Sequence, residues 1–77
     1  MQDWKNHIEV VPEIMYGKPV IRGTRIPVDI ILEKMSNGQT NQEIIRNYPD
    51  LNEEDLLACL SFVTSLLRKE LIIPLSR

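Results

Sequence analysis

The sequence predicts a mainly α-helical domain, a three-helix bundle preceded by a short β-hairpin-like element. Pro12, Pro19 and Pro27 break any long helix in the first third of the chain. Beyond Pro27, apolar residues recur at helical spacing and capping residues separate the segments. With 77 residues, 43% of them hydrophobic, the chain has room for one small domain with a thin core. We therefore expect a single domain, with an N-terminal arm at 1–7, a β element at 8–27, the bundle at 28–70 and a tail at 71–77.

The β element is predicted as an antiparallel pair of strands, roughly 8–11 and 19–22. The run from Ile8 to Val11 is β-prone and ends at Pro12. The four residues 16–19, Tyr-Gly-Lys-Pro, are turn chemistry, because glycine tolerates a positive φ and proline fixes its own. A second extended stretch, interrupted by Gly23, follows the turn.

The first helix is predicted to begin at Pro27, a residue suited to a helix start. Asp29 in its first turn complements the helix dipole. Gly38 is suited to end the helix in a left-handed conformation. Between these limits one apolar stripe runs along the helix: Val28, Ile31, Leu32 and Met35.

Two further helices follow from capping signals. Thr40 with Glu43 forms a capping box for a short helix that Pro49 stops. Asn52, followed by three acidic residues, caps a longer helix that runs to about Glu70. Helix, glycine turn, short helix, proline turn and longer helix together have the outline of a helix-turn-helix bundle.

The third helix is apolar over most of its surface. We expect one narrow polar strip, formed by Glu54, Ala58, Ser61, Ser65 and Arg68. Two short helices cannot cover the wide apolar remainder, so we expect it to meet a second subunit or a different protein. The residues predicted for this partner or dimer interface are Leu57, Phe62, Leu66, Arg68, Leu71 and Ile73.

Composition excludes several classes of protein. A net charge of −2 argues against a polybasic nucleic-acid binder. No apolar run approaches the roughly 20 residues that span a bilayer, and the first residues lack the features of a signal peptide. One cysteine, Cys59, cannot form an internal disulfide. We expect a soluble cytoplasmic protein without a membrane contact.

The charge is unevenly distributed. Residues 1–28 carry four cations against three acids and 56–77 carry three against one, whereas 29–55 carry two against seven. The cations of the β element could contact phosphates, although Arg25 is the one for which we expect a structural role. The acidic start of the third helix would repel DNA, which disfavours standard groove reading by that helix. The candidate DNA contacts are Lys18, Arg22, Thr24, Arg25, Gln42 and Arg46.

Catalytic and metal chemistry find no support in the sequence. His7 is a lone histidine in a segment that we expect to be mobile, and Cys59 falls on an apolar helix face. The acids at 50–55 are explained by helix capping and the dipole. We therefore expect no enzyme activity, no metal, no cofactor and no small-molecule substrate.

The stretch from Gly17 to Val28, Gly-Lys-Pro-Val-Ile-Arg-Gly-Thr-Arg-Ile-Pro-Val, resembles the signature of a prokaryotic family catalogued as DUF433. The resemblance continues through Gly38, 43–45, 48–51 and 54–55, and covers roughly residues 8–64. It implies a homeodomain-like fold with a small β element in front.

The resemblance also implies a function. It implies the antitoxin of a type II toxin–antitoxin pair, which neutralises a PIN-like ribonuclease and binds its operator DNA as a homodimer to repress its own gene. The basic and apolar segment 65–77 could contact the acidic site of such a nuclease. The alternative is a protein-interaction module, or a small subunit of another complex, that binds no nucleic acid.

Overall fold

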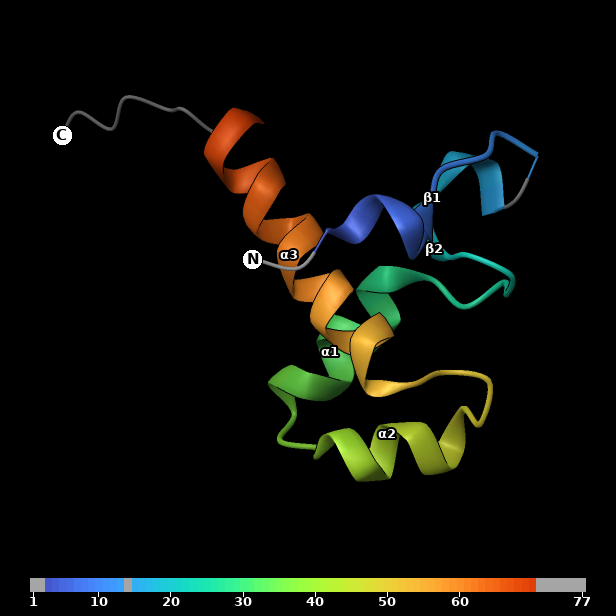
Figure 1. Cartoon of the computed structure of the whole chain (residues 1–77), viewed down its shortest axis with the longest axis vertical. Helices are drawn as coiled ribbons and strands as arrows, with labels where there is room; N and C mark the ends of the chain where they lie inside the picture. The colour runs from blue at the N-terminus through green and yellow to red at the C-terminus, as the bar shows by residue number, and fades with distance from the viewer. Residues whose placement is uncertain (1–2, 14, 71–77) are drawn as a thin grey trace, which may run out of the picture.

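The computed structural model describes residues 3–13 and 15–70 (Figure 1). Two single 3₁₀ turns, η1 (Trp4–Asn6) and η2 (Met15–Gly17), alternate with the strands β1 (Ile8–Glu9) and β2 (Val20–Ile21). Three helices follow, α1 (Val28–Ser36), α2 (Asn41–Asn47) and α3 (Glu53–Glu70). The prediction of three helices preceded by a short antiparallel hairpin is confirmed.

The hairpin is shorter than the sequence suggests. Ile8 pairs with Ile21 and Glu9 with Val20, and no further ladder forms toward Val10, whose side chain is exposed. Both β2 residues are buried, so the hairpin belongs to the core. The amide of Val28 donates to the carbonyl of Pro19 at 3.0 Å, which joins the start of α1 to the hairpin.

The predicted helix ends are confirmed for α1 and α2. Gly38 has a φ of 90° just beyond α1, as a left-handed C-terminal residue requires. At α2 the capping box is complete: the Glu43 amide donates to Thr40 Oγ1 at 3.1 Å, and the Thr40 amide donates to Glu43 Oε1 at 2.8 Å.

The start of α3 carries a second capping box and holds the N-terminal segment. The Asp55 amide donates to Asn52 Oδ1 at 2.9 Å, and the Asn52 amide donates to Asp55 Oδ2 at 3.1 Å. The other oxygen of Asp55 lies 2.8 Å from His7 Nδ1, and both side chains are mostly buried. One carboxylate therefore caps α3 and joins it to the chain before β1.

Within the predicted N-terminal arm at 1–7, residues Trp4 to His7 are packed on the domain. Residues 4–6 form η1, which packs against α3, and the Trp4 ring lies edge-on to Phe62 with centroids 4.8 Å apart. The physical reason is apolar burial, because an indole placed in solvent would lose this contact. Residues 1–2 lie outside the described residues.

The predicted polar strip on α3 is wrong in part. Ala58 and Ser61 are buried, and only Glu54 and Arg68 of that strip are exposed. Small side chains let the surrounding chain pack close to the helix backbone, so this side of α3 faces inward despite its low hydrophobicity. The exposed apolar side of α3 lies elsewhere, at Leu57, Leu60 and Leu67.

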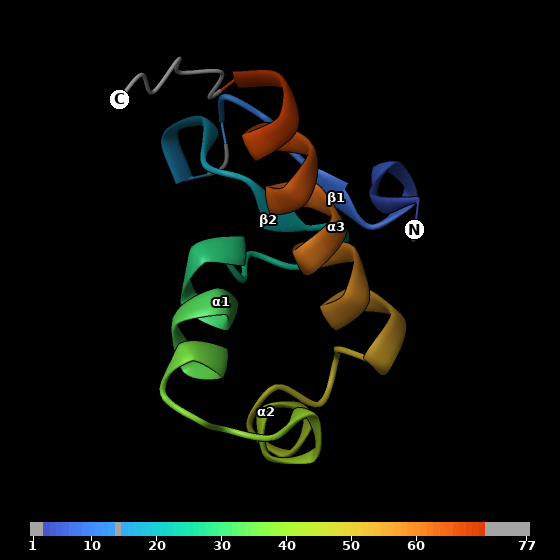
Figure 2. The same ribbon diagram turned by 90° about the vertical axis from the view of Figure 1, so that its left-hand side faces the viewer.

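The helices surround one core, to which the hairpin also contributes. α1 and α3 stand side by side, α2 lies across one end of this pair, and the hairpin lies at the other (Figures 1 and 2). The core draws on every one of these elements: Ile8, Ile21, Val28, Ile31, Ile44, Leu51, Leu56, Ala58, Cys59 and Phe62.

Candidate functional site

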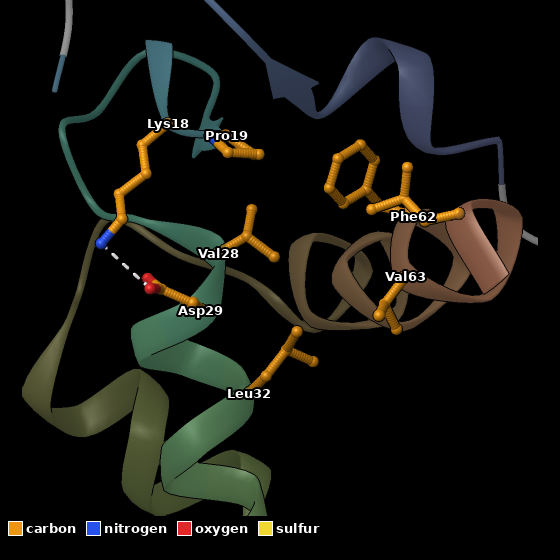
Figure 3. A pocket seen from close by; sticks show the side chains of 8 residues that line it. Lys18, Pro19, Val28, Asp29, Leu32, Phe62 and Val63 are labelled. Atoms are coloured by element: carbon orange, nitrogen blue, oxygen red, sulfur yellow. Dashed lines mark ion pairs between the residues drawn. The ribbon is translucent and has the colours of Figure 1, made fainter. Parts of the chain in front are cut away.

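An apolar groove opens between α1 and α3 next to the start of β2. It has a volume of about 280 Å³ (Figure 3). Apolar side chains of the hairpin, α1 and α3 supply most of its walls. The full lining is Lys18, Pro19, Val28, Asp29, Leu32, Phe62, Val63 and Leu66. The hairpin, α1 and α3 each contribute, so the groove exists only in the folded domain.

One ion pair marks the edge of the groove. Lys18 Nζ lies 3.0 Å from Asp29 Oδ2, and both side chains are substantially exposed (Figure 3). An exposed pair of this kind stabilises the fold by at most about 1 kcal/mol. Lys18 and Asp29 therefore remain available to exchange each other for charged groups on a partner, while the rest of the lining offers apolar contact.

The lining of the groove favours apolar groups as its occupant. Small-molecule sites occupy roughly 300–1,000 Å³ and are lined mostly by apolar side chains with a small number of polar groups. This groove lies just below that range, and its only charged lining residues pair with each other at the edge. The groove has room for one or two apolar groups.

Phe62 corrects the predicted interface. Its side chain is only 8% exposed and packs against Trp4, so it belongs to the core and not to an exposed face. It also lines the groove. Of the other predicted interface residues, Leu57 and Leu66 are 49% and 40% exposed and Arg68 is exposed, whereas Leu71 and Ile73 lie outside the described residues.

Three of the predicted DNA contacts are engaged within the fold. Arg22 lies 3.2 Å from Glu9 Oε1 and donates to the carbonyl of Lys5 at 3.1 Å. Lys18 pairs with Asp29. Thr24 shapes the turn after β2, since its hydroxyl donates to the Ile21 carbonyl at 2.6 Å and accepts from the Ile26 amide at 3.0 Å.

The expectation of a structural role for Arg25 is wrong. Arg25 is exposed and, within residues 3–13 and 15–70, takes part in no ion pair, whereas Lys18 and Arg22 do. Gln42 and Arg46 are exposed on α2. α2 and the hairpin lie at opposite ends of the domain (Figures 1 and 2). The candidate DNA contacts on α2 therefore do not share one surface with those of the hairpin.

The two side chains with catalytic potential are held in structural roles. His7 is bound to Asp55, contrary to the expected mobile terminus. Cys59 is fully buried, and burial, with a smaller contribution from the Asp55 charge, raises its pKa from 9.0 to about 12. The thiol stays protonated at neutral pH and is no nucleophile. Within the described part of the chain, no three His, Cys, Asp or Glu residues gather to hold a metal ion.

Sequence reasoning missed most of the groove. Four of its lining residues were predicted in a turn or on apolar helix faces but not in one common site: Pro19, Val28, Leu32 and Val63. The signal that could have found the groove is that α1 and α3, which the sequence already placed in one bundle, each carry an apolar stripe. Trp4 was missed as well, although tryptophan is a residue type that is highly buried on average.

Fold and site together define a small helical domain that offers an apolar groove, an exposed leucine face on α3, a buried cysteine and a histidine held by Asp55. No helix in the described part of the chain is both long and apolar enough to cross a bilayer.

This chain belongs to the DUF433 family of proteins of unknown function, whose model matches residues 8–63. The crystal structure of a DUF433 member protein from Anabaena variabilis ATCC 29413 is similar, with a TM-score of 0.76 and 32% sequence identity. The similarity covers 84% of this chain and 64% of that chain, so it spans less than two thirds of the Anabaena protein. No curated protein matches this sequence. The family is described only as one of unknown function, and the Anabaena protein is described only as a member of it.

Proposed function

We propose that this chain is the antitoxin of a type II toxin–antitoxin pair, and that it captures a PIN-like ribonuclease in the cytoplasm through the groove between α1 and α3. The observation that carries the protein-binding part is the groove itself, which is apolar, open and bounded by one exchangeable ion pair. The class of partner rests on the resemblance of residues 17–28 to antitoxin-like proteins.

The groove suits an amphipathic segment of the ribonuclease. Val28 and Leu32 line it from α1, and Val63 and Leu66 line it from α3, so a helix or strand could lay two apolar side chains between them. Charged residues beside those side chains would meet Lys18 and Asp29. The interaction would block the ribonuclease by covering it, without any chemistry on the part of the antitoxin.

Leu66→Glu is expected to weaken capture of the ribonuclease by about tenfold or more, because it places a carboxylate on an apolar wall of the groove. Leu66 is 40% exposed, so the domain should still fold. The measurement is the binding affinity for a PIN-like ribonuclease encoded beside this gene, with RNA cleavage as the second readout. Leu60→Glu, a leucine of α3 outside the groove lining, is the matched control and should bind normally. Equal affinity of Leu66→Glu and the parent would contradict a role for the groove.

Binding of operator DNA, with repression of its own gene, is the second part of the proposal. The observation that favours it is the turn after β2, where Arg25 is exposed and unpaired in the described part of the chain. Arg22 beside it is held by a pair with Glu9, which costs at most about 1 kcal/mol to break, and by a hydrogen bond to the carbonyl of Lys5.

Arg22→Ala together with Arg25→Ala should weaken binding to the DNA upstream of the gene and reduce the salt dependence of that binding, because phosphate contacts release counterions. A gel-shift titration at two salt concentrations measures both. Lys34→Ala on α1, a cation near the Tyr48 ring, serves as the control for loss of one positive charge. Unchanged affinity of the double variant would exclude the β element as the DNA contact, and absence of salt-dependent binding by the parent would favour the protein-interaction module.

A further inference from the structure

The solvent side of α3 carries leucines that lie outside the hydrophobic core. Leu57, Leu60 and Leu67 are 49%, 45% and 55% exposed, which is high for side chains of this size in a 77-residue domain. They lie outside the groove, whose α3 residues are Phe62, Val63 and Leu66. α3 therefore presents two separate apolar surfaces.

The exposed leucines are spaced as in a coiled coil. Leu57, Leu60, Thr64 and Leu67 follow one another at intervals of three, four and three residues, which places them on one line along the helix. We call these four residues the α3 seam. Thr64 fits such a surface, because its hydroxyl donates to the Leu60 carbonyl at 2.8 Å and is thereby satisfied within its own helix. The seam extends over roughly 15 Å of helix.

The charges beside the seam decide how a second helix would lie on it. The first turn of α3 is acidic, with Glu53, Glu54 and Asp55, and the last turn is basic, with Arg68 and Lys69. Two copies of α3 placed in parallel would bring the acidic ends together. Two copies placed antiparallel bring each acidic end against a basic end.

We infer that a second copy of this chain docks antiparallel along the α3 seam. Two-fold symmetry then sets Leu57 opposite the partner's Leu67 and Leu60 opposite the partner's Thr64. In the same register Glu54 and Arg68 lie on one flank of the seam, so that Glu54 of each copy faces the partner's Arg68. Both side chains are exposed, and neither takes part in an ion pair within residues 3–13 and 15–70.

This inference deepens the homodimer that belongs to the proposed function, but it rests on α3 alone. The dimer buries a short seam, at the low end of interface sizes, so we expect a dissociation constant of about 1–100 μM. It leaves the groove of each copy open for the ribonuclease. The experiment uses the purified chain without DNA or ribonuclease, so a failed seam leaves the test of capture intact.

Sedimentation velocity over a concentration series tests the seam. The parent chain should shift from monomer to dimer, and Leu60→Glu should remain monomeric at every concentration. Leu66→Glu, on the groove side, should dimerise like the parent. Circular dichroism establishes that each variant is folded. A parent that stays monomeric, or a Leu60→Glu variant that dimerises normally, overturns the proposal.

A charge exchange tests the antiparallel register. Glu54→Arg and Arg68→Glu should each raise the dissociation constant by about tenfold, because each places two repulsive pairs in the dimer. The double variant restores opposite charges and should recover dimerisation close to that of the parent. If the double variant is no better than either single variant, Glu54 does not face the partner's Arg68 and the register is wrong.

Discussion

Trp4→Ala should lower the free energy of unfolding by about 3 kcal/mol, although Trp4 is only the fourth residue of the sequence. The indole packs edge-on against Phe62 at 4.8 Å between centroids and closes one side of the core. Such aromatic pairs contribute about 0.5–1.5 kcal/mol beyond their buried area. In a domain of this size the change should lower the midpoint of thermal unfolding by roughly 15 °C, as measured by circular dichroism.

Tyr16→Ala is the matched control for loss of an aromatic ring. The Tyr16 side chain is fully exposed, so its removal should change the free energy of unfolding by less than about 0.5 kcal/mol. Trp4→Phe, which retains a ring against Phe62, should fall between the two. A Trp4→Ala variant as stable as Tyr16→Ala would mean that residues 4–6 do not pack on α3.

Asp55→Ala should lower the free energy of unfolding by about 2–3 kcal/mol. The substitution removes the hydrogen bond from the Asn52 amide, and capping bonds of this kind contribute about 1 kcal/mol. It also leaves the mostly buried His7 without its partner at 2.8 Å. Urea denaturation provides the measurement. Glu54→Ala, the exposed neighbouring acid, should cost less than about 0.5 kcal/mol.

The double variant of His7→Ala and Asp55→Ala separates the two roles of the carboxylate. If Asp55 joins η1 to α3 through His7, the double variant is less destabilised than the sum of the single variants, by about 1 kcal/mol. Additive effects would leave only the capping role.

Local signals in the sequence predicted the elements well. The Thr40 and Glu43 capping box, the glycine after α1 and the acidic start of α3 each depend on residues within one turn of each other, and the structure confirms them. The hairpin was predicted for the same reason, since its prolines and glycines act locally. These features need no knowledge of what packs against them.

Contacts across the chain were not predictable in the same way. Asp55 was explained by helix capping and the dipole, and nothing at position 55 shows that its second oxygen reaches His7, 48 residues away. Ala58 and Ser61 were placed on a polar strip because of their side chains, whereas their burial follows from what packs against them. The groove arises for the same reason, because it needs α1, α3 and Pro19 in one place.

The sequence predicted one wide apolar face on α3. In the structure this face divides into two apolar surfaces. Leu66 belongs to the groove and Leu57 to the seam, so the predicted partner and dimer interface divides into two sites that point in different directions. A single chain could then hold its ribonuclease and its second copy at the same time.

The central claim is that this chain acts by binding a protein in its groove. The most direct measurement is RNA cleavage by the proposed partner, a PIN-like ribonuclease, titrated with the purified chain and with the Leu66→Glu variant. We expect the parent chain to abolish cleavage at an equimolar ratio and Leu66→Glu to require about tenfold more protein. Cleavage that continues undiminished in the presence of excess parent chain would contradict the claim.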